Sequence, residues 1–140
     1  MLNHSQTLLK VQQLLSTMYA SGVDVIYQAA GGTGTGVFTA AKEVNEKLDA
    51  DSDKKVWVIG VDRDQNAEGN YTSSDKKKSN FVLTSTIKKV GTVVKDIANG
   101  QLKGDKFEGG STKTYGIKDG GVDIVTSKLP SDIKDAVRKS

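Results

Sequence analysis

Short apolar runs alternate along this chain with segments whose apolar residues recur at helical spacing. The runs cover residues 23–27, 56–61 and 81–83 and are rich in β-branched and aromatic residues, which favour strands. Spacings of three and four residues predict helices before, between and after these runs. The residues that carry this spacing are Leu8, Val11, Leu15 and Met18; Phe38, Ala41, Val44 and Leu48; Ile87, Val90, Val94 and Ile97; and Ile133 and Val137.

The order of these elements predicts an α/β fold. The run at 56–61 is almost wholly apolar, as expected of a strand buried on both faces of a parallel sheet. Near the end of the chain, residues 112–117 and 122–125 flank a Lys-Asp-Gly-Gly turn, which favours a hairpin. We therefore expect a single α/β domain over residues 1–140: a three-layer sandwich with a mostly parallel sheet, helices on both faces and a terminal hairpin.

A cluster of glycines from Gly31 to Gly36 follows the first apolar run and precedes a helical segment. The backbone N–H groups of such a turn can approach a ligand closely, near the positive end of the next helix. Neither common phosphate motif fits: the P-loop spacing is followed by Val37 and Phe38 instead of Lys and Ser or Thr, and G-x-G-x-x-G is absent. The turn therefore predicts either a ligand-contacting loop or a tight turn that packs the helix on the sheet.

Polar residues follow the other two strands. Asp62 ends the second apolar run, and Thr84 and Ser85 follow the third, with Lys88 one turn into the expected helix. If the strands are parallel neighbours, these residues share one edge of the sheet with the glycine turn. A carboxylate there can accept charge-assisted hydrogen bonds from two vicinal sugar hydroxyls, and a lysine can bind the same hydroxyls. In the alternative interpretation Asp62 caps a loop and Lys88 is a solvated surface lysine.

Few residue types suited to catalysis are present. The chain has no cysteine and a single histidine, His4, which excludes thiol chemistry and zinc sites and disfavours a Ser-His-Asp triad. Asp62 and Asp64 form an acidic pair suited to binding a metal or to acid–base work. No other nucleophile lies beside a base, so we expect a binding module with no metal or cofactor rather than an enzyme.

Composition is that of an ordinary soluble globular protein, with 36% hydrophobic and 26% charged residues and a net charge of +3. The densest basic run, Lys76 to Lys78, lies among serines and an aspartate, which indicates a solvated loop and no nucleic-acid partner. No apolar stretch approaches the ~20 residues of a membrane helix, and no signal peptide opens the chain.

Four ordered motifs resemble one known family. The stretches DVIYQAAGGTGTGVF, VIGVDRDQ, VLTSTIKKVG and DGGVDIV are similar to the basic membrane protein family, over about Leu8 to Ala136. Its members are substrate-binding lipoproteins of ABC transporters, many of them purine nucleoside receptors. The resemblance implies a type I periplasmic-binding-protein fold, whose two lobes are joined by crossing strands and hold nucleoside between them. This chain is similar to the second, C-terminal lobe alone, without the N-terminal lobe and signal peptide.

The resemblance also implies roles for individual residues. Asp62 corresponds to an aspartate that binds the ribose hydroxyls, and Lys88 to a lysine that reaches the ribose. Gly32 and Gly34 lie in the family's glycine turn, which borders the ligand. Tyr27 lies near the position of an aromatic residue that contacts the base.

The function that follows from the resemblance is delivery of purine nucleosides to an ABC permease. The full-length receptor is then expected on the extracellular face of the cell membrane, held by a lipid anchor absent from this chain. A surface normally covered by the other lobe would be exposed, which favours self-association. Two alternatives remain: a sensory or regulatory protein of the same fold, and a small α/β enzyme acting on a sugar or nucleotide through Asp62 and Asp64.

Overall fold

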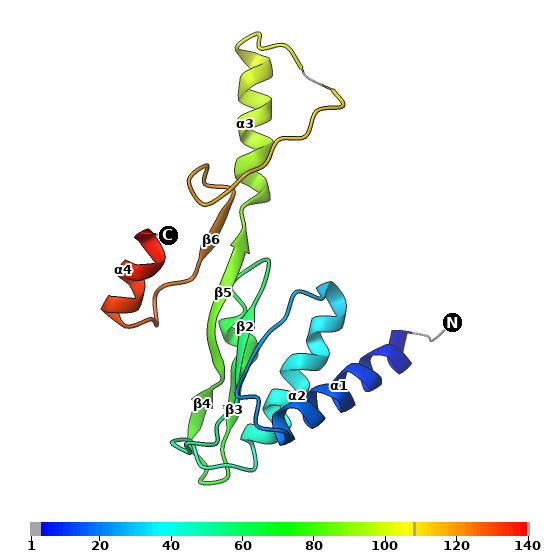
Figure 1. Cartoon of the computed structure of the whole chain (residues 1–140), viewed down its shortest axis with the longest axis vertical. Coiled ribbons are helices and arrows are strands. Elements are labelled where there is room, and N and C mark those ends of the chain that lie inside the picture. Colours follow the sequence, from blue (N-terminus) through cyan, green and yellow to red (C-terminus); the bar gives the residue numbers. More distant parts are fainter. Residues whose placement is uncertain (1–3, 108, 140) are drawn as a thin grey trace.

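The computed structural model describes residues 4–107 and 109–139 (Figure 1). These residues form four α-helices and six strands, with short 3₁₀ turns at Gly31–Gly34 and Asn66–Gly69, and no α-helix separates the four strands between residues 57 and 88. The elements are α1 (His4–Ala20), β1 (Val25–Tyr27), α2 (Thr35–Asn45), β2 (Trp57–Gly60), β3 (Asn70–Thr72), β4 (Lys78–Asn80), β5 (Val82–Lys88), α3 (Val90–Leu102), β6 (Val122–Ile124) and α4 (Ser131–Lys139).

The main sheet has the strand order β1-β2-β5-β6. β1 pairs with β2 and β2 pairs with β5 in parallel, while β6 runs antiparallel to β5. The expected α/β class with a mostly parallel sheet is therefore confirmed. Parallel pairing brings the carboxyl ends of β1 and β2 to one edge, beside the second half of β5, because Tyr27 pairs with Ile59 and Gly60 pairs with Ser85.

The terminal hairpin was predicted wrongly. Residues 112–117 form no strand, and β6 instead pairs with β5, with Lys88 opposite Val122. Lys113 and Tyr115 both bind the carboxylate of Asp96 on α3, at 3.0 and 2.9 Å, so this segment follows the helix. These side-chain bonds hold the segment beside α3, where it has no strand to pair with.

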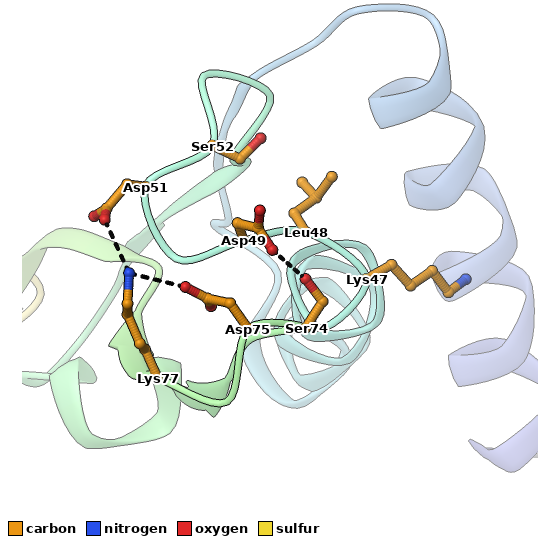
Figure 2. Close-up of a pocket in the computed structure, with 8 residues that line it drawn as sticks. All are labelled: Lys47, Leu48, Asp49, Asp51, Ser52, Ser74, Asp75 and Lys77. Atoms are coloured by element: carbon orange, nitrogen blue, oxygen red, sulfur yellow. Dashed lines mark hydrogen bonds and ion pairs between the residues drawn. The ribbon is translucent and has the colours of Figure 1, made fainter.

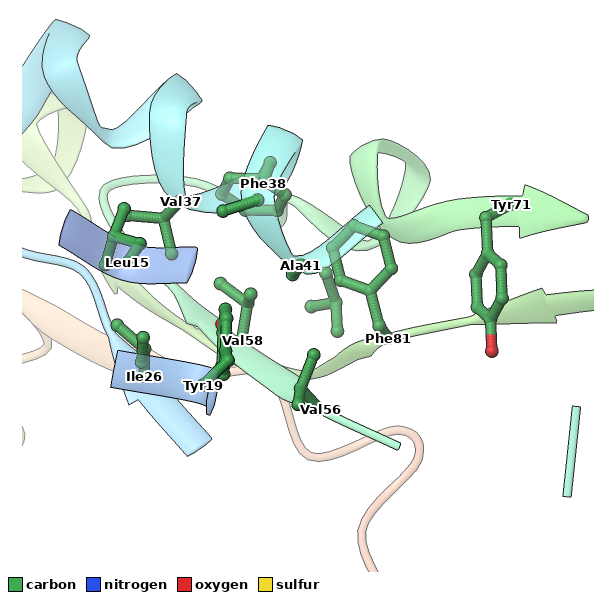
Figure 3. Packing of buried hydrophobic residues seen from close by; sticks show 12 residues of the cluster. Leu15, Tyr19, Ile26, Val37, Phe38, Ala41, Val56, Val58, Tyr71 and Phe81 are labelled. Carbon is green, nitrogen blue, oxygen red and sulfur yellow. The ribbon is translucent and has the colours of Figure 1, made fainter. Parts of the chain in front are cut away.

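The hydrophobic core lies between the sheet and the two helices α1 and α2 (Figure 3). Phe81 is fully buried at its centre, with ring centroids 6.1 Å from Phe38 and 5.8 Å from Tyr71. Such tilted aromatic pairs stabilise a core beyond the area they bury. The other buried apolar residues are Leu15, Tyr19, Ile26, Val37, Ala40, Ala41, Val56, Val58 and Val82.

A buried asparagine fixes where α2 ends. The side chain of Asn45 donates to the carbonyl of Val56 at 2.9 Å and accepts from its N–H at 3.0 Å. Both backbone groups of Val56, just before β2, are thus satisfied within the core. The helix ends at Asn45, earlier than Leu48, because this side chain ties it to the sheet.

The polar stretch after β2 contains a small hairpin that the sequence pattern did not predict. β3 and β4 pair antiparallel, and Tyr71 on β3 is 5% exposed. The turn between them includes Lys76 at a φ of 64°. Hydrophobic alternation is absent here because a single aromatic side chain anchors the hairpin to the core.

Helix α3 does not cover the second face of the sheet, contrary to the expected three layers. None of its residues is buried, and it stands clear of the α1–α2 layer at the end of β5 (Figure 1). Tyr27 of β1 is likewise 53% exposed on the face away from the core. The exposed apolar side chains of α3, here called the α3 face, are Val90, Val94, Ile97 and Leu102.

No helix within residues 4–107 and 109–139 combines the length and the apolar character needed to cross a membrane.

We expect Phe81→Ala to lower the free energy of unfolding of the 140-residue chain by about 3–5 kcal/mol, because a large cavity replaces the ring. Urea denaturation followed by circular dichroism measures this change. Leu102→Ala is the matched control, since Leu102 is 86% exposed and should change stability little. Equal effects of the two substitutions would contradict the assigned core.

We expect the purified chain to self-associate through the α3 face as its concentration rises. Sedimentation velocity should show this, and the double substitution Val94→Asp and Ile97→Asp should return the chain to a monomer. Leu14 on α1 is equally exposed, at 62%, so Leu14→Asp serves as the control and should leave association unchanged. Association that survives the α3 substitutions would assign it to another surface.

Candidate ligand-binding site

Asp62 occupies a strained position directly after β2. Its φ is 71°, and the N–H of Arg63 donates to the carbonyl of Val61 at 2.9 Å across it. The backbone therefore makes a γ-turn with positive φ, a rare conformation that aspartate tolerates better than most residues. Such strain persists only where surrounding contacts fix it, and it concentrates at functional sites.

Lys88 is the principal partner of Asp62. Its Nζ lies 2.7 Å from the Asp62 carboxylate, and its backbone N–H donates to the Asp62 carbonyl at 3.1 Å. The hydrogen bond to that carboxylate, and then its charge, raise the pKa of Lys88 above its ordinary value. The sequence predicted that the two would converge, and they do, but Lys88 is the last residue of β5 and not part of a helix.

Tyr27 adds an aromatic side chain to the same edge of the sheet. Its hydroxyl lies 3.2 Å from Thr86 Oγ1, and the Thr86 hydroxyl donates to the Gly60 carbonyl at 3.4 Å. Thr86 therefore accepts its bond from Tyr27, which links the ends of β1, β2 and β5. Tyr27 is 53% exposed, so a ligand can reach it.

The two glycines predicted to border the ligand differ in their surroundings. Gly34 is buried, and a Cβ there would lie 2.1 Å from Oε1 of Gln28. Gly32 is exposed and has nothing within 4 Å of such a Cβ. Gly34 is thus required for packing, whereas the open surface of the turn lies at Gly32.

The arrangement offers hydrogen-bond acceptors and donors at one edge of the sheet. One Asp62 oxygen binds Lys88, and the other has no hydrogen-bond partner among the described residues. The side chains of Lys88 and Asp62 are 63% and 52% exposed, so a ligand can reach both. A carboxylate and an ammonium side by side can bind a pair of vicinal hydroxyls, with the carboxylate as acceptor.

Asp64 caps a turn, whereas Asp62 forms an ion pair. Its Oδ1 accepts the N–H of Asn66 at 2.9 Å and so stabilises the 3₁₀ turn at Asn66–Gly69. Among the described residues, no three acidic or histidine side chains gather as a metal site would require. The acidic pair considered from the sequence is therefore divided between a loop cap and an ion pair.

A larger hollow, of about 490 Å³, lies near the amino end of β2 (Figure 2). Its charged groups bind one another: Lys77 Nζ lies 2.9 Å from Asp75 and 3.6 Å from Asp51. Hydrogen bonds from Ser73 and Lys77 lower the pKa of Asp75. These pairs join the loop after α2 to the β3–β4 turn, which is a structural role. No pattern in the sequence indicated this hollow.

Two polar residues beneath the edge, Gln28 and Gln65, were missed. They are bonded in a chain with Ser85, which the sequence had already assigned to this edge, and the chain connects residues of β5 to those that follow β1 and β2. Gln28 and Ser85 are 4% and 0% exposed. The only signal of Gln28 and Gln65 in the sequence is that each lies near a strand end, which many solvated residues share.

Comparison with known proteins identifies similar chains. A family model described as "ABC transporter substrate-binding protein PnrA-like" matches residues 5–140. The chain is 57% identical over 132 residues to a Lactococcus lactis protein named "ABC transporter nucleoside-binding protein BmpA", which covers 94% of this chain and 36% of that protein. It is 53% identical over 108 residues to the "CD4+ T-cell-stimulating antigen" of Listeria monocytogenes, covering 77% of this chain and 29% of the antigen.

A more distant relative is "Basic membrane protein B" of Borreliella afzelii, 36% identical over 127 residues, which are 90% of this chain and 32% of that protein. The chain thus spans about a third of the length of these relatives.

The contrast between the two glycines can be tested. We expect Gly34→Ala to destabilise the chain by about 1–3 kcal/mol, because the added methyl group overlaps Gln28. Gly32→Ala should leave stability unchanged, and in the full-length receptor it should weaken ligand binding if the ligand lies against the turn. Thermal unfolding and calorimetric titration measure the two effects. A destabilised Gly32→Ala with an unaffected Gly34→Ala would reverse the assignment.

Proposed function

Because the chain belongs to the family of PnrA-like ABC transporter substrate-binding proteins, we propose that it is the second lobe of a receptor that delivers purine nucleosides to an ABC permease. Asp62 accepts hydrogen bonds from the ribose diol, and Lys88 donates to the same hydroxyls. Tyr27 contacts the base, while Gly32 and Gly34 form the turn that borders the ligand. This function is that of a binding protein, in keeping with the family's description, and involves no catalysis and no cofactor.

The observation that carries this proposal is the exposed Asp62–Lys88 pair, held at 2.7 Å beside a strained backbone turn. An ion pair with no task would gain little from such a conformation, because exposed pairs contribute at most about 1 kcal/mol. The strain of a positive φ costs a similar or larger amount. A ligand that bonds to both groups would offset the free-energy cost of the strained turn.

The architecture supports a single-lobe interpretation. β5 continues past the sheet into α3, and the chain returns through β6, so β5 and β6 form a two-stranded link (Figure 1). Beyond that link, the α3 face exposes apolar side chains that a partner normally covers. The remaining two thirds of the receptor would supply that partner, as well as the far wall of the ligand site.

The full-length receptor would work outside the cell. A lipid anchor would tie it to the membrane, and it would dock on the permease with its ligand enclosed. The sensory alternative shares the same site and differs only in its partner. The enzymatic alternative has no support, because Asp64 is engaged by Asn66 and the family is one of binding proteins.

In the full-length receptor, we expect Asp62→Ala to weaken nucleoside binding at least tenfold. Hydrogen bonds to charged groups contribute about 1.5–3 kcal/mol each, and closure of two lobes removes water from them. Lys88→Ala should cost less, because a flexible lysine is a poorer geometric match for a diol. Isothermal titration calorimetry with adenosine, guanosine and inosine measures both.

Lys77→Ala is the control, since it removes a charged lysine at the opposite end of the sheet and should leave affinity unchanged. The 140-residue chain alone should bind nucleosides feebly, because it contacts one side of the ligand. An Asp62→Ala receptor with unaltered affinity would remove the ribose role, and tight binding by the chain alone would make the rest of the receptor dispensable.

A further inference from the structure

Gln65 lies three residues after Asp62, and its hydrogen bonds connect the turn at Asp62 with neighbouring strands. Its Oε1 accepts the N–H of Val61 at 2.9 Å and the Nε2–H of Gln28 at the same distance. Its own backbone N–H donates to Oγ of the fully buried Ser85 at 3.1 Å. Through its side chain and its backbone N–H, Gln65 therefore joins residues that follow β1 and β2 to the middle of β5.

The nitrogen of the Gln65 side-chain amide is linked, through Glu68, to Arg63 on the other side of the turn. Its Nε2 donates to Glu68 at 2.6 Å, and Glu68 forms an ion pair with Arg63 at 2.6 Å. Val61 and Arg63 are the residues whose backbone bond closes the γ-turn around Asp62. Gln65 thus holds one flank of the turn directly and the other through Glu68.

The space beneath the turn is filled so closely that the chain needs a glycine there. A Cβ on Gly60 would lie 2.5 Å from Ser85 Oγ and 3.0 Å from both Cβ and Oε1 of Gln65. Gln65 packs against the strand backbone at this point, and it cannot move away without losing its bonds to Ser85 and Gln28. Gln65, which holds the turn, is therefore itself held in place by Gln28, which follows β1, and by Ser85 on β5.

From these contacts we propose that Gln65 is a positioning residue, which holds the strained turn so that the Asp62 carboxylate meets a vicinal diol. This inference rests on the proposed function of Asp62. Gln65 itself touches no ligand, because its amide is engaged with Val61, Gln28 and Glu68. Its contribution is pre-organisation: without it the turn relaxes toward ordinary φ values and the carboxylate moves from its place beside Lys88.

A ligand with and without the diol separates this role from a merely structural one. In the full-length receptor, calorimetry first measures the affinities for adenosine, guanosine and inosine. For each nucleoside that binds, the affinity for its 2′,3′-dideoxy form is then measured. Gln65→Met should weaken binding of the ribonucleoside about tenfold, which is the scale of one unmade buried hydrogen bond. Binding of the dideoxynucleoside should change less than about twofold, because it never engages Asp62.

Three further variants sharpen the test. Gln65→Glu keeps an acceptor for Val61 and Gln28, but it removes the donor to Glu68 and places a second carboxylate beside it, so it should recover only part of the lost affinity. Gln65→Asn retracts the amide by one methylene, and should show the same selective loss if Gln65→Met does not fold. Gln12→Met is the matched control, because it removes another glutamine that donates to a glutamate, Glu43, at 2.7 Å on the far side of the core. It should leave both affinities unchanged.

The outcomes are distinct. Selective loss of the diol contribution, absent when Gln65→Met is made in an Asp62→Ala receptor, supports the proposal. Equal weakening of both ligands, or no weakening, overturns it while leaving the role of Asp62 intact. A receptor whose preference for the diol is unaffected by Asp62→Ala, or that binds no nucleoside, overturns the proposed function instead.

Discussion

Parallel pairing of β2 with β5 is the interaction on which the candidate site depends. It places Lys88, the last residue of β5, beside Asp62, the second residue after β2, although the two lie 26 positions apart in the sequence. The backbone bond from Lys88 to Asp62 and their ion pair then close the edge of the sheet. If β5 ran antiparallel to β2, the carboxyl ends of the two strands would lie at opposite edges of the sheet, and the carboxylate and the lysine would be far apart.

This pairing also explains why the chain has one well-packed region and one open region. Apolar side chains of α1, α2 and the first part of β5 form a closed core around Phe81. Beyond Lys88 there is no sheet for the chain to cover, so the α3 face remains in solvent. The contacts of the return segment include the bonds of Lys113 and Tyr115 to Asp96, the bond from the Lys89 N–H to the Gly121 carbonyl, and the pairing of β6 with β5. Such a division is expected of a chain that makes up part of a larger two-sided receptor.

The sequence predicted the parts of the fold that repeat a pattern. Apolar runs and helical spacing indicated the strands around Ile26 and Val58 and the helices α1, α2 and α4 correctly. The pattern was wrong about the extent of β5. It ended the strand at Leu83 and made Thr84 and Ser85 its exit, whereas both lie within β5 and make hydrogen bonds to residues outside it. The pattern was also wrong about residues 112–117. Their alternating side chains form hydrogen bonds with α3 instead of packing within a strand.

Within the site, the convergence of Asp62 with Lys88 was predictable from strand order alone. The positive φ at Asp62, the separate role of Asp64 and the bonds of Gln65 were not, because each depends on contacts among residues from several strands. The proposed ligand class comes from the resemblance to a family. The proposed role of Asp62 comes from the carboxylate and ammonium held side by side at this turn.

A structure of the full-length receptor with a bound purine nucleoside tests the central claim most directly. The account predicts that both ribose hydroxyls lie within hydrogen-bonding distance of the Asp62 carboxylate, with Lys88 beside them and the γ-turn unchanged. A nucleoside whose ribose contacts other residues, with Asp62 and Lys88 paired only to each other, would contradict it.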